Sequence, residues 1–213
     1  MSFNRIAFCY DSLARMVFGD AIRRAQVHFL FYIPPNAHIL VVGGGTGWII
    51  DEIWKRKQET TFVYIDISSE MIRRAKKLVR EQYPTHMQNI EFRTGSLDLL
   101  TDTDTFDVVI TPFFLDLFTS AQLPGISQRL ISVLKQKGIW LFTDFHLPPS
   151  QPMRTVATLL IRTMYLFFRV VTHISAKKLP NFDLYFPSDT FTLQEKQYFY
   201  MNIIQTKIFL KIV

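Results

Sequence analysis

The fold of this chain is decided by one stretch of its sequence, His38-Ile39-Leu40-Val41-Val42-Gly43-Gly44-Gly45-Thr46-Gly47-Trp48-Ile49-Ile50. An apolar run leads into four glycines within five residues, and apolar residues then resume at helical spacing through Trp54. This order predicts a buried strand, a tight turn and the start of a helix. Glycine suits the turn because the backbone must adopt positive φ and pass close to a neighbour. Since a helix start presents free N–H groups and a positive dipole end, the stretch predicts a loop that binds a nucleotide or a cofactor.

The spacing of the glycines excludes two common phosphate-binding loops. A P-loop needs Lys followed by Ser or Thr after its last glycine, but Trp48-Ile49 stand there. A dinucleotide fingerprint needs glycine at the sixth place of GxGxxG, and counting from Gly43 that place holds Trp48. The remaining alternative to a cofactor loop is a glycine turn in an ordinary α/β protein, which leaves four glycines in five residues unexplained.

The next predicted strand, 61–66, ends in a carboxylate. Asp66 comes 23 residues after Gly43. Ligands of open α/β sheets bind beyond the carboxyl ends of the strands, where a carboxylate can accept two hydrogen bonds from a ribose diol. The position therefore favours ribose binding for Asp66 over capping of the following helix, whereas Ser68 is the expected helix cap.

Several segments in this order resemble the class I S-adenosylmethionine (SAM) methyltransferases, in particular the branch of ubiquinone and menaquinone C-methyltransferases. They are the GxGxG of 43–47, the run Asp66-Ile67-Ser68 with Met71 and Ala75, the strand 106–111, the helix–turn–strand segment 134–144, and Ala7 with Tyr10-Asp11. The resemblance covers about half of the chain, as five β/α units between residues 38 and 146. It implies an α/β fold with a Rossmann-like, seven-stranded, mainly parallel sheet in the order 3-2-1-4-5-7-6 and helices on both faces.

The expected single methyltransferase domain, 1–213, has four parts. They are an N-terminal helical lid (1–35), a SAM-binding β/α core (38–146), a helical cap (150–190) and a C-terminal β-hairpin (190–213). In the lid, helical spacing predicts one helix up to Val17 and a second from Ala21 to Tyr32. In the core, a helix from Leu123 is expected to end at Lys137-Gly138.

The resemblance implies SAM as the cofactor and S-adenosylhomocysteine (SAH) as its product. The residues expected to bind it are Gly43, Gly44, Gly45, Thr46, Gly47, Asp66, Ile67, Met71, Ser96, Leu97, Thr111 and Phe113. Ile67 is expected to pack on adenine, and Ser96 and Leu97 to meet the adenine edge, with Asp98 as the alternative.

The segment after the fourth strand is expected to face the methionine part of SAM. Phe113 and Phe114 can form an aromatic wall that attracts the sulfonium cation, or they can belong to the core. Thr111 and Asp116 are the candidates for binding the methionine amine.

The proposed chemistry is in-line methyl transfer to a small, apolar or aromatic acceptor. Since the sulfonium is already activated, the protein chiefly aligns donor and acceptor in a dry site, and only some acceptors require a base. His146, just past the fifth strand, is the first candidate for a base or acceptor ligand, and Tyr10 is the second. A loop histidine without a role is the alternative for His146. The sequence has no cluster of Cys and His ligands, so no metal site is expected.

The chain departs from the family at the place of an acid that usually precedes the glycine loop, where Val41 stands. Two alternatives follow. One is a catalytically inactive SAM- or SAH-binding protein. The triple glycine also resembles aminopropyltransferases, which use decarboxylated SAM, although these have Asp in place of Thr46.

Composition limits the classes of partner and compartment. The chain has 213 residues, 48% hydrophobic and 20% charged, which fits one globular domain. Its net charge of +6 comes from scattered basic residues, so solvated helix faces are favoured and no nucleic-acid partner is expected. The single cysteine, Cys9, fits a reducing compartment, and no apolar signal core follows the N-terminus. These features predict a cytoplasmic protein, while its oligomeric state stays open.

The long apolar segment 153–174 carries Arg154, Arg162 and Arg169. Arginines inside hydrocarbon are costly, which excludes a membrane span. The segment is expected to form a core helix beside a greasy acceptor pocket. Peripheral membrane contact through 153–174 is the alternative.

Overall fold

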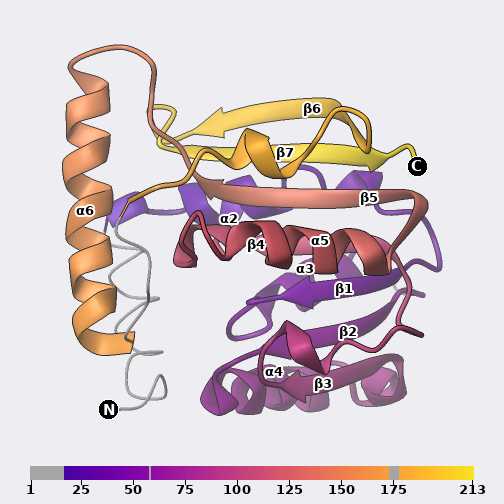
Figure 1. The fold of residues 1–213 in the computed structure, drawn as a ribbon. Helices are drawn as coiled ribbons and strands as arrows, with labels where there is room; N and C mark the ends of the chain where they lie inside the picture. Colours follow the sequence, from indigo (N-terminus) through magenta and orange to yellow (C-terminus); the bar gives the residue numbers. More distant parts are fainter. Residues whose placement is uncertain (1–16, 58, 173–177) are drawn as a thin grey trace.

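A seven-stranded sheet in the order β3-β2-β1-β4-β5-β7-β6 organises the molecule (Figure 1). The computed structural model describes residues 17–57, 59–172 and 178–213. The strands are β1 (His38–Val42), β2 (Thr61–Asp66), β3 (Ile90–Thr94), β4 (Phe106–Pro112), β5 (Leu134–Phe145), β6 (Phe191–Phe199) and β7 (Ile204–Lys211). Strands β1 to β5 pair in parallel, and β7 is antiparallel to both β5 and β6. The predicted fold and strand order are confirmed.

Five helices and five short 3-10 turns connect these strands in the described part of the chain. The helices are α2 (Ala21–Val27), α3 (Trp48–Trp54), α4 (Ser69–Gln82), α5 (Leu123–Val133) and α6 (Met153–Thr172). The turns are η2 (Leu30–Tyr32), η3 (Pro84–Asn89), η4 (Leu97–Leu99), η5 (Leu115–Leu117) and η6 (Phe182–Tyr185). The first predicted lid helix ends at Val17, and all of its earlier residues lie outside the described part of the chain.

The sheet is covered on both faces. Helices α2, α3 and α4 lie on one face, and α5 and η6 lie on the other (Figure 1). Central strands buried on two faces need apolar side chains at every position rather than at alternate ones. This explains the uninterrupted apolar run of β1, whose residues from Ile39 to Val42 are at most 2% exposed.

Helix α6 stands across the carboxyl ends of the parallel strands (Figure 1). Its buried side chains, including Ala157 and Ile161, join a separate cluster with Phe113, Phe145 and Ile204. Its outer side is apolar as well, since Leu159 is 69% exposed. Within the described residues, no helix is long and apolar enough to cross a membrane.

Two predicted element ends are wrong. Helix α2 ends at Val27, and Leu30–Tyr32 forms a 3-10 turn instead of continuing the helix. The turn lets Phe29, Leu30 and Ile33 all enter the same core cluster, and burial of these side chains overrides helical continuity. Helix α5 ends at Val133, so the expected stop at Lys137-Gly138 lies inside β5.

The segment around Lys137 is a β-bulge rather than a helix end. Phe106 pairs with Leu134, but the next pair joins Val108 to Ile139. Lys137 adopts a φ of 60° within the extra residues. A bulge leaves its extra residues unpaired and bends the strand, which a sequence pattern for a helix end does not distinguish.

Candidate functional site

The glycine loop between β1 and α3 is tied to the neighbouring strand β2 at three points. The Gly43 amide donates to the carbonyl of Ile65 at 2.9 Å. The Gly45 amide donates to Asp66 Oδ2 at 3.1 Å, and the Tyr64 hydroxyl donates to the Gly45 carbonyl, also at 3.1 Å. The amide and the carbonyl of Gly45 are therefore both hydrogen-bonded to side chains of β2.

Two glycines of the loop differ in the space around their Cα atoms. Gly45 has a φ of 67°, and a Cβ placed there would meet nothing within 4 Å. Gly47 has a φ of 86° at the N-cap of α3, and a Cβ there would lie 2.7 Å from the Cβ and 2.9 Å from the Cα of Ala75. Gly47 thus lets α3 and α4 pack closely, while Gly45 leaves open space above the loop for a ligand.

Asp66 orders the backbone on both sides of itself. Its Oδ1 accepts from the Ser68 amide at 2.9 Å, and its Oδ2 accepts from Gly45. Burial raises the pKa of this carboxyl, and the two amide donors act against that rise. Ser68 is the N-cap of α4, accepting from the Met71 amide at 3.3 Å, as predicted. A carboxylate oxygen can accept more than one hydrogen bond, so ribose binding by Asp66 stays a prediction.

Ile67, Ser96 and Leu97 occupy the loops beside Asp66. Ile67 is 60% exposed, so its apolar side chain is open to a planar ligand. The Ser96 hydroxyl donates to Asp98 Oδ2 at 2.6 Å, which joins the two candidates for the adenine edge. The Leu97 side chain lies in the core, so its backbone is what this loop can offer.

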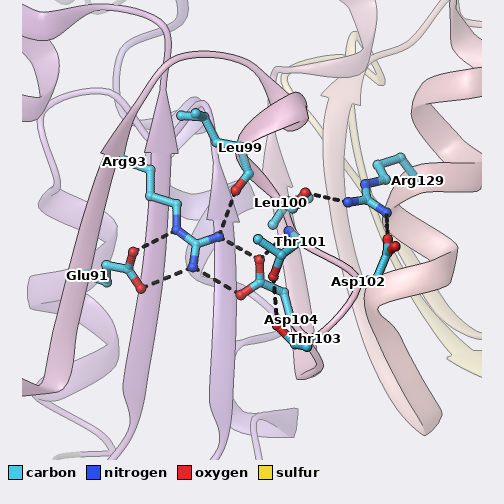
Figure 2. A network of polar contacts seen from close by, with 9 residues as sticks. All are labelled: Glu91, Arg93, Leu99, Leu100, Thr101, Asp102, Thr103, Asp104 and Arg129. Carbon is cyan, nitrogen blue, oxygen red and sulfur yellow. Dashed lines mark hydrogen bonds and ion pairs between the residues drawn. The ribbon is translucent and has the colours of Figure 1, made fainter.

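An arginine network fixes the connection from β3 to β4, which carries that loop (Figure 2). Arg93 donates to both oxygens of Asp104 at 2.6 and 3.0 Å, to Glu91 at 2.8 and 3.1 Å, and to the Leu99 carbonyl at 3.1 Å. These bonds to Arg93 lower the pKa of Asp104 to about 2. From α5, Arg129 donates to the Leu100 carbonyl and to Asp102. The loop is therefore held in place by charge-assisted hydrogen bonds.

The segment after β4 brings Phe114, rather than Phe113, to the glycine loop. A Cβ on Gly43 would lie 3.1 Å from Cδ2 of Phe114. Phe113, at a φ of 50°, is 8% exposed and packs against Phe145 with ring centroids 4.9 Å apart. Both phenylalanines are candidates for the aromatic wall expected from the sequence, but the expected cofactor-binding residues include only Phe113. The sequence gives no signal that separates two adjacent phenylalanines, because the left-handed backbone at Phe113 decides which ring turns inward.

Thr111 lies beneath the site. It is fully buried, and its hydroxyl accepts a hydrogen bond from the indole of Trp140 at 2.8 Å. Its side chain belongs to the core between β4 and β5, so the structure does not offer that hydroxyl to a methionine amine.

Asp116, the other amine candidate, is also buried and lies beside Asp144 of β5. The Asp116 amide donates to Asp144 Oδ2 at 3.2 Å, and the Phe145 amide donates to Oδ1 at 2.8 Å. Asp116 Oδ1 has no hydrogen-bond partner among the described residues. Burial raises the pKa of both carboxyls, and Asp116 raises that of Asp144 further. This pair retains a proton at pH values where exposed carboxyls have lost theirs.

His146, the first catalytic candidate, lines a cavity that does not include the glycine loop. Its Nδ1 is 2.8 Å from the Asn202 carbonyl, and its ring packs on Tyr198 with centroids 4.7 Å apart. It lines a cavity of about 300 Å³ with residues from α6, η6, β6 and β7, and none of the lining residues comes from the glycine loop. Tyr10, the second candidate, lies outside the described residues.

The segment that holds the candidate site matches a known family. Residues 39–138, which hold the glycine loop, Asp66 and the arginine network, match the family model described as a methyltransferase domain. This segment of the chain is therefore similar to a methyltransferase domain. No comparison distinguishes the quinone C-methyltransferase branch, so that narrower assignment stays a prediction.

Two curated relatives resemble the methyltransferase domain and its surroundings. One is malonyl-[acyl-carrier protein] O-methyltransferase of Priestia megaterium, 26% identical over 149 residues, or 67% of this chain and 49% of that protein. The other is polyamine aminopropyltransferase of Bacillus subtilis, 26% identical over 121 residues, or 53% of this chain and 42% of that protein. The chain thus spans about half the length of the curated relatives that it matches.

Solved structures share the fold. An O-methyltransferase family 2 protein of Planctomyces limnophilus, solved with apigenin, has a TM-score of 0.70 at 17% identity and covers 100% of this chain and 62% of that chain. N-methyltransferase NodS of Bradyrhizobium japonicum, solved with SAH, has a TM-score of 0.60 at 11% identity, covering 89% and 87%.

Proposed function

We propose that the chain is a SAM-dependent methyltransferase that acts on a small, apolar or aromatic molecule. The observation that carries this proposal is the glycine loop, held to β2 by Tyr64 and Asp66 with its open side at Gly45, inside the segment that matches the family. The SAH bound by NodS and the apigenin bound by the Planctomyces protein support the choice of cofactor and of a small acceptor.

The described residues would bind SAM along the carboxyl edge of the sheet. Asp66 would accept from the ribose hydroxyls, and Ile67 would pack on adenine beside Ser96 and Leu97. The Phe114 ring, which lies next to the glycine loop, suits the sulfonium cation, because aromatic rings attract cations. Tyr64 and Asp66 take over the ordering of the loop, which explains how it holds its shape with Val41 in place of the usual acid.

In this proposal the cofactor supplies an activated methyl group, and the protein supplies alignment and exclusion of water. Phe113, Phe145 and Ile161 close the carboxyl edge on the α6 side with apolar surface. His146 and Tyr10 remain predictions for a base. The Asp116 and Asp144 carboxyls are too deeply buried to meet an acceptor in the described conformation.

A second candidate function is aminopropyl transfer from decarboxylated SAM. The match to polyamine aminopropyltransferase favours it, together with the three consecutive glycines of the loop. Decarboxylated SAM lacks the carboxylate of SAM, so binding measurements separate the two candidates.

Calorimetric titration of the full chain with SAH, decarboxylated SAM and NAD tests the proposal. We expect micromolar binding of SAH and no binding of NAD. Asp66→Asn should weaken SAH binding by about tenfold or more, since a hydrogen bond to a charged group contributes about 1.5–3 kcal/mol. The matched control, Asp189→Asn, removes an exposed loop carboxylate and should leave the affinity unchanged. Tighter binding of decarboxylated SAM would favour aminopropyl transfer, and no binding of any of the three would overturn both functions.

A further inference from the structure

A cavity on the α5 face of the sheet is lined by several basic side chains. It has a volume of about 300 Å³ and lies between η6, the start of α6 and the β5–β7–β6 side of the sheet. We call it the cation pocket and define it by His146, Arg154, Asp183, Tyr198, Gln205 and Lys207. Small-molecule sites begin at about this size, so a compact ligand fits it. All of these residues lie beyond residue 138, where the family match ends.

Lys207 makes this pocket unusual. Its side chain is 8% exposed in the middle of β7, and its Nζ lies 2.5 Å from Oδ1 of Asp183, which is 71% exposed. Directly across the hairpin, Lys196 of β6 stands in register with Lys207. Like charges at directly opposed positions destabilise a sheet, so fold stability does not explain this pair.

The remaining charges of the pocket do not balance these lysines. Arg154, on the first turn of α6, adds a third cation, and Asp183 is the one acid among the described lining residues. One positive charge is therefore left over among the lining residues, and Lys196, which flanks the pocket without lining it, adds a second. Burial lowers the pKa of His146, and the charges of Lys207 and Lys196 act in the same direction. His146 accordingly adds a polar ring edge rather than a fourth cation.

We propose that the cation pocket binds a small phosphate monoester. A monoester carries close to two negative charges near neutral pH and thus matches the two uncompensated cations. Its phosphate oxygens would lie between Arg154 and Lys207, because guanidinium and ammonium groups are the usual hydrogen-bond donors to phosphate. The organic part would lie against Tyr198 and the apolar side chains of Leu147 and Leu179, which also line the pocket. This inference goes beyond methyl transfer and does not depend on it.

Calorimetric titration of the full chain with phenyl phosphate, inorganic phosphate and benzoate, at about 0.15 M salt, tests the proposal. We expect phenyl phosphate to bind more tightly than the other two, because it alone offers both the dianion and an apolar part. The His146 ring resonance should shift on its addition. Absence of phenyl phosphate binding, or equal binding of benzoate, would overturn the proposal.

Charge variants locate the site. Arg154→Gln should weaken phenyl phosphate binding by about tenfold, the usual effect of losing one charge-assisted hydrogen bond. The matched control is Arg80→Gln, which removes an exposed helical arginine of α4 far along the sheet and should have no effect. Equal weakening by both variants would show a non-specific charge effect and refute the site.

SAH binding provides the separate readout. Arg154→Gln should bind SAH as the unmodified chain does, which also shows that the variant is folded. If SAH fails to bind either protein while phenyl phosphate binds as expected, the proposed function fails and the cation pocket stands. Loss of both ligands in Arg154→Gln alone would contradict a site that is independent of the cofactor loop.

Discussion

The carboxyl edge of the sheet has two sides that are built differently. On the glycine-loop side, which comprises the loops after β1, β2 and β3, backbone amides and carbonyls are held by Tyr64, Asp66 and Arg93. On the α6 side, which comprises α6 and the ends of β4 and β5, apolar side chains such as Ile161 form a cluster, and the Asp116 and Asp144 carboxyls are buried. Short polar motifs with fixed backbone geometry specify the first side. Long-range packing specifies the second, so the two sides should respond differently to substitution.

The largest effect is expected on the glycine-loop side. Gly47→Ala places a side chain at a φ of 86° and 2.9 Å from the Cα of Ala75. The left-handed backbone costs about 1–2 kcal/mol and overpacking about 1–3 kcal/mol, so unfolding free energy should fall by about 4 kcal/mol. Urea denaturation measures it. Gly125→Ala in α5 is the control, since a Cβ there meets nothing within 4 Å, and it should stabilise the protein by up to about 1 kcal/mol. Equal effects would contradict the close approach of α3 to α4.

On the α6 side, the effect of a substitution on stability depends on whether the side chain is buried. Ile161 is 3% exposed, so Ile161→Ala should lower the unfolding free energy by about 3 kcal/mol through lost contacts and a cavity. Leu159→Ala, two residues away on the 69% exposed side, should change it by less than about 0.5 kcal/mol. A comparable loss in the Leu159 variant would mean that another part of the protein covers the outer side of α6.

The arginine network gives an intermediate effect. Arg93→Ala removes the partner of the largely buried Asp104 and should cost about 2 kcal/mol at neutral pH. Arg73→Ala, at a 64% exposed residue paired with Glu70, should leave the stability essentially unchanged.

Acid titration isolates the contribution of Asp104 within that network. Because Arg93 depresses the pKa of Asp104, the pair stabilises the fold above the unfolded-state pKa of about 4 and loses this effect as pH falls toward 2. The Arg93 variant should therefore lose less stability than the unmodified chain below pH 4. Parallel acid unfolding curves for the two proteins would refute the role of this pair.

The smallest effect concerns the buried carboxyls. Their pKa values are raised in the folded state, so the folded chain holds more protons than the unfolded chain above about pH 4, and stability falls as pH rises. Asp116→Asn should make stability fall less steeply between pH 5 and pH 7, because it removes one of the two groups that hold extra protons in the folded state. Asp189→Asn, in an exposed loop, serves as the control. A slope identical to that of the unmodified chain would show that Asp116 does not hold a proton in this range.

The same contrast explains what the sequence could predict. The glycine loop and the Ser68 cap follow from local patterns, because turn geometry and helix capping restrict residue type at those positions. The strand order follows from the family resemblance. Tyr64 could have been found from its place two residues before Asp66, since alternate strand residues share a face. The bonding of Thr111 to Trp140 and the meeting of Asp116 with Asp144 join residues that are far apart in the sequence, and no local pattern signals them.

The two outermost strands of the described sheet also bear on how the protein behaves at high concentration. Unpaired strand edges can recruit further chains and start aggregation. At one end, β3 is five residues long and carries Glu91 and Arg93. At the other end, β6 carries Glu195 and Lys196, and a register shift beside Leu193 interrupts its regular geometry. Short length, charge and irregularity are recognised protections against strand addition, so both ends of this sheet oppose self-association.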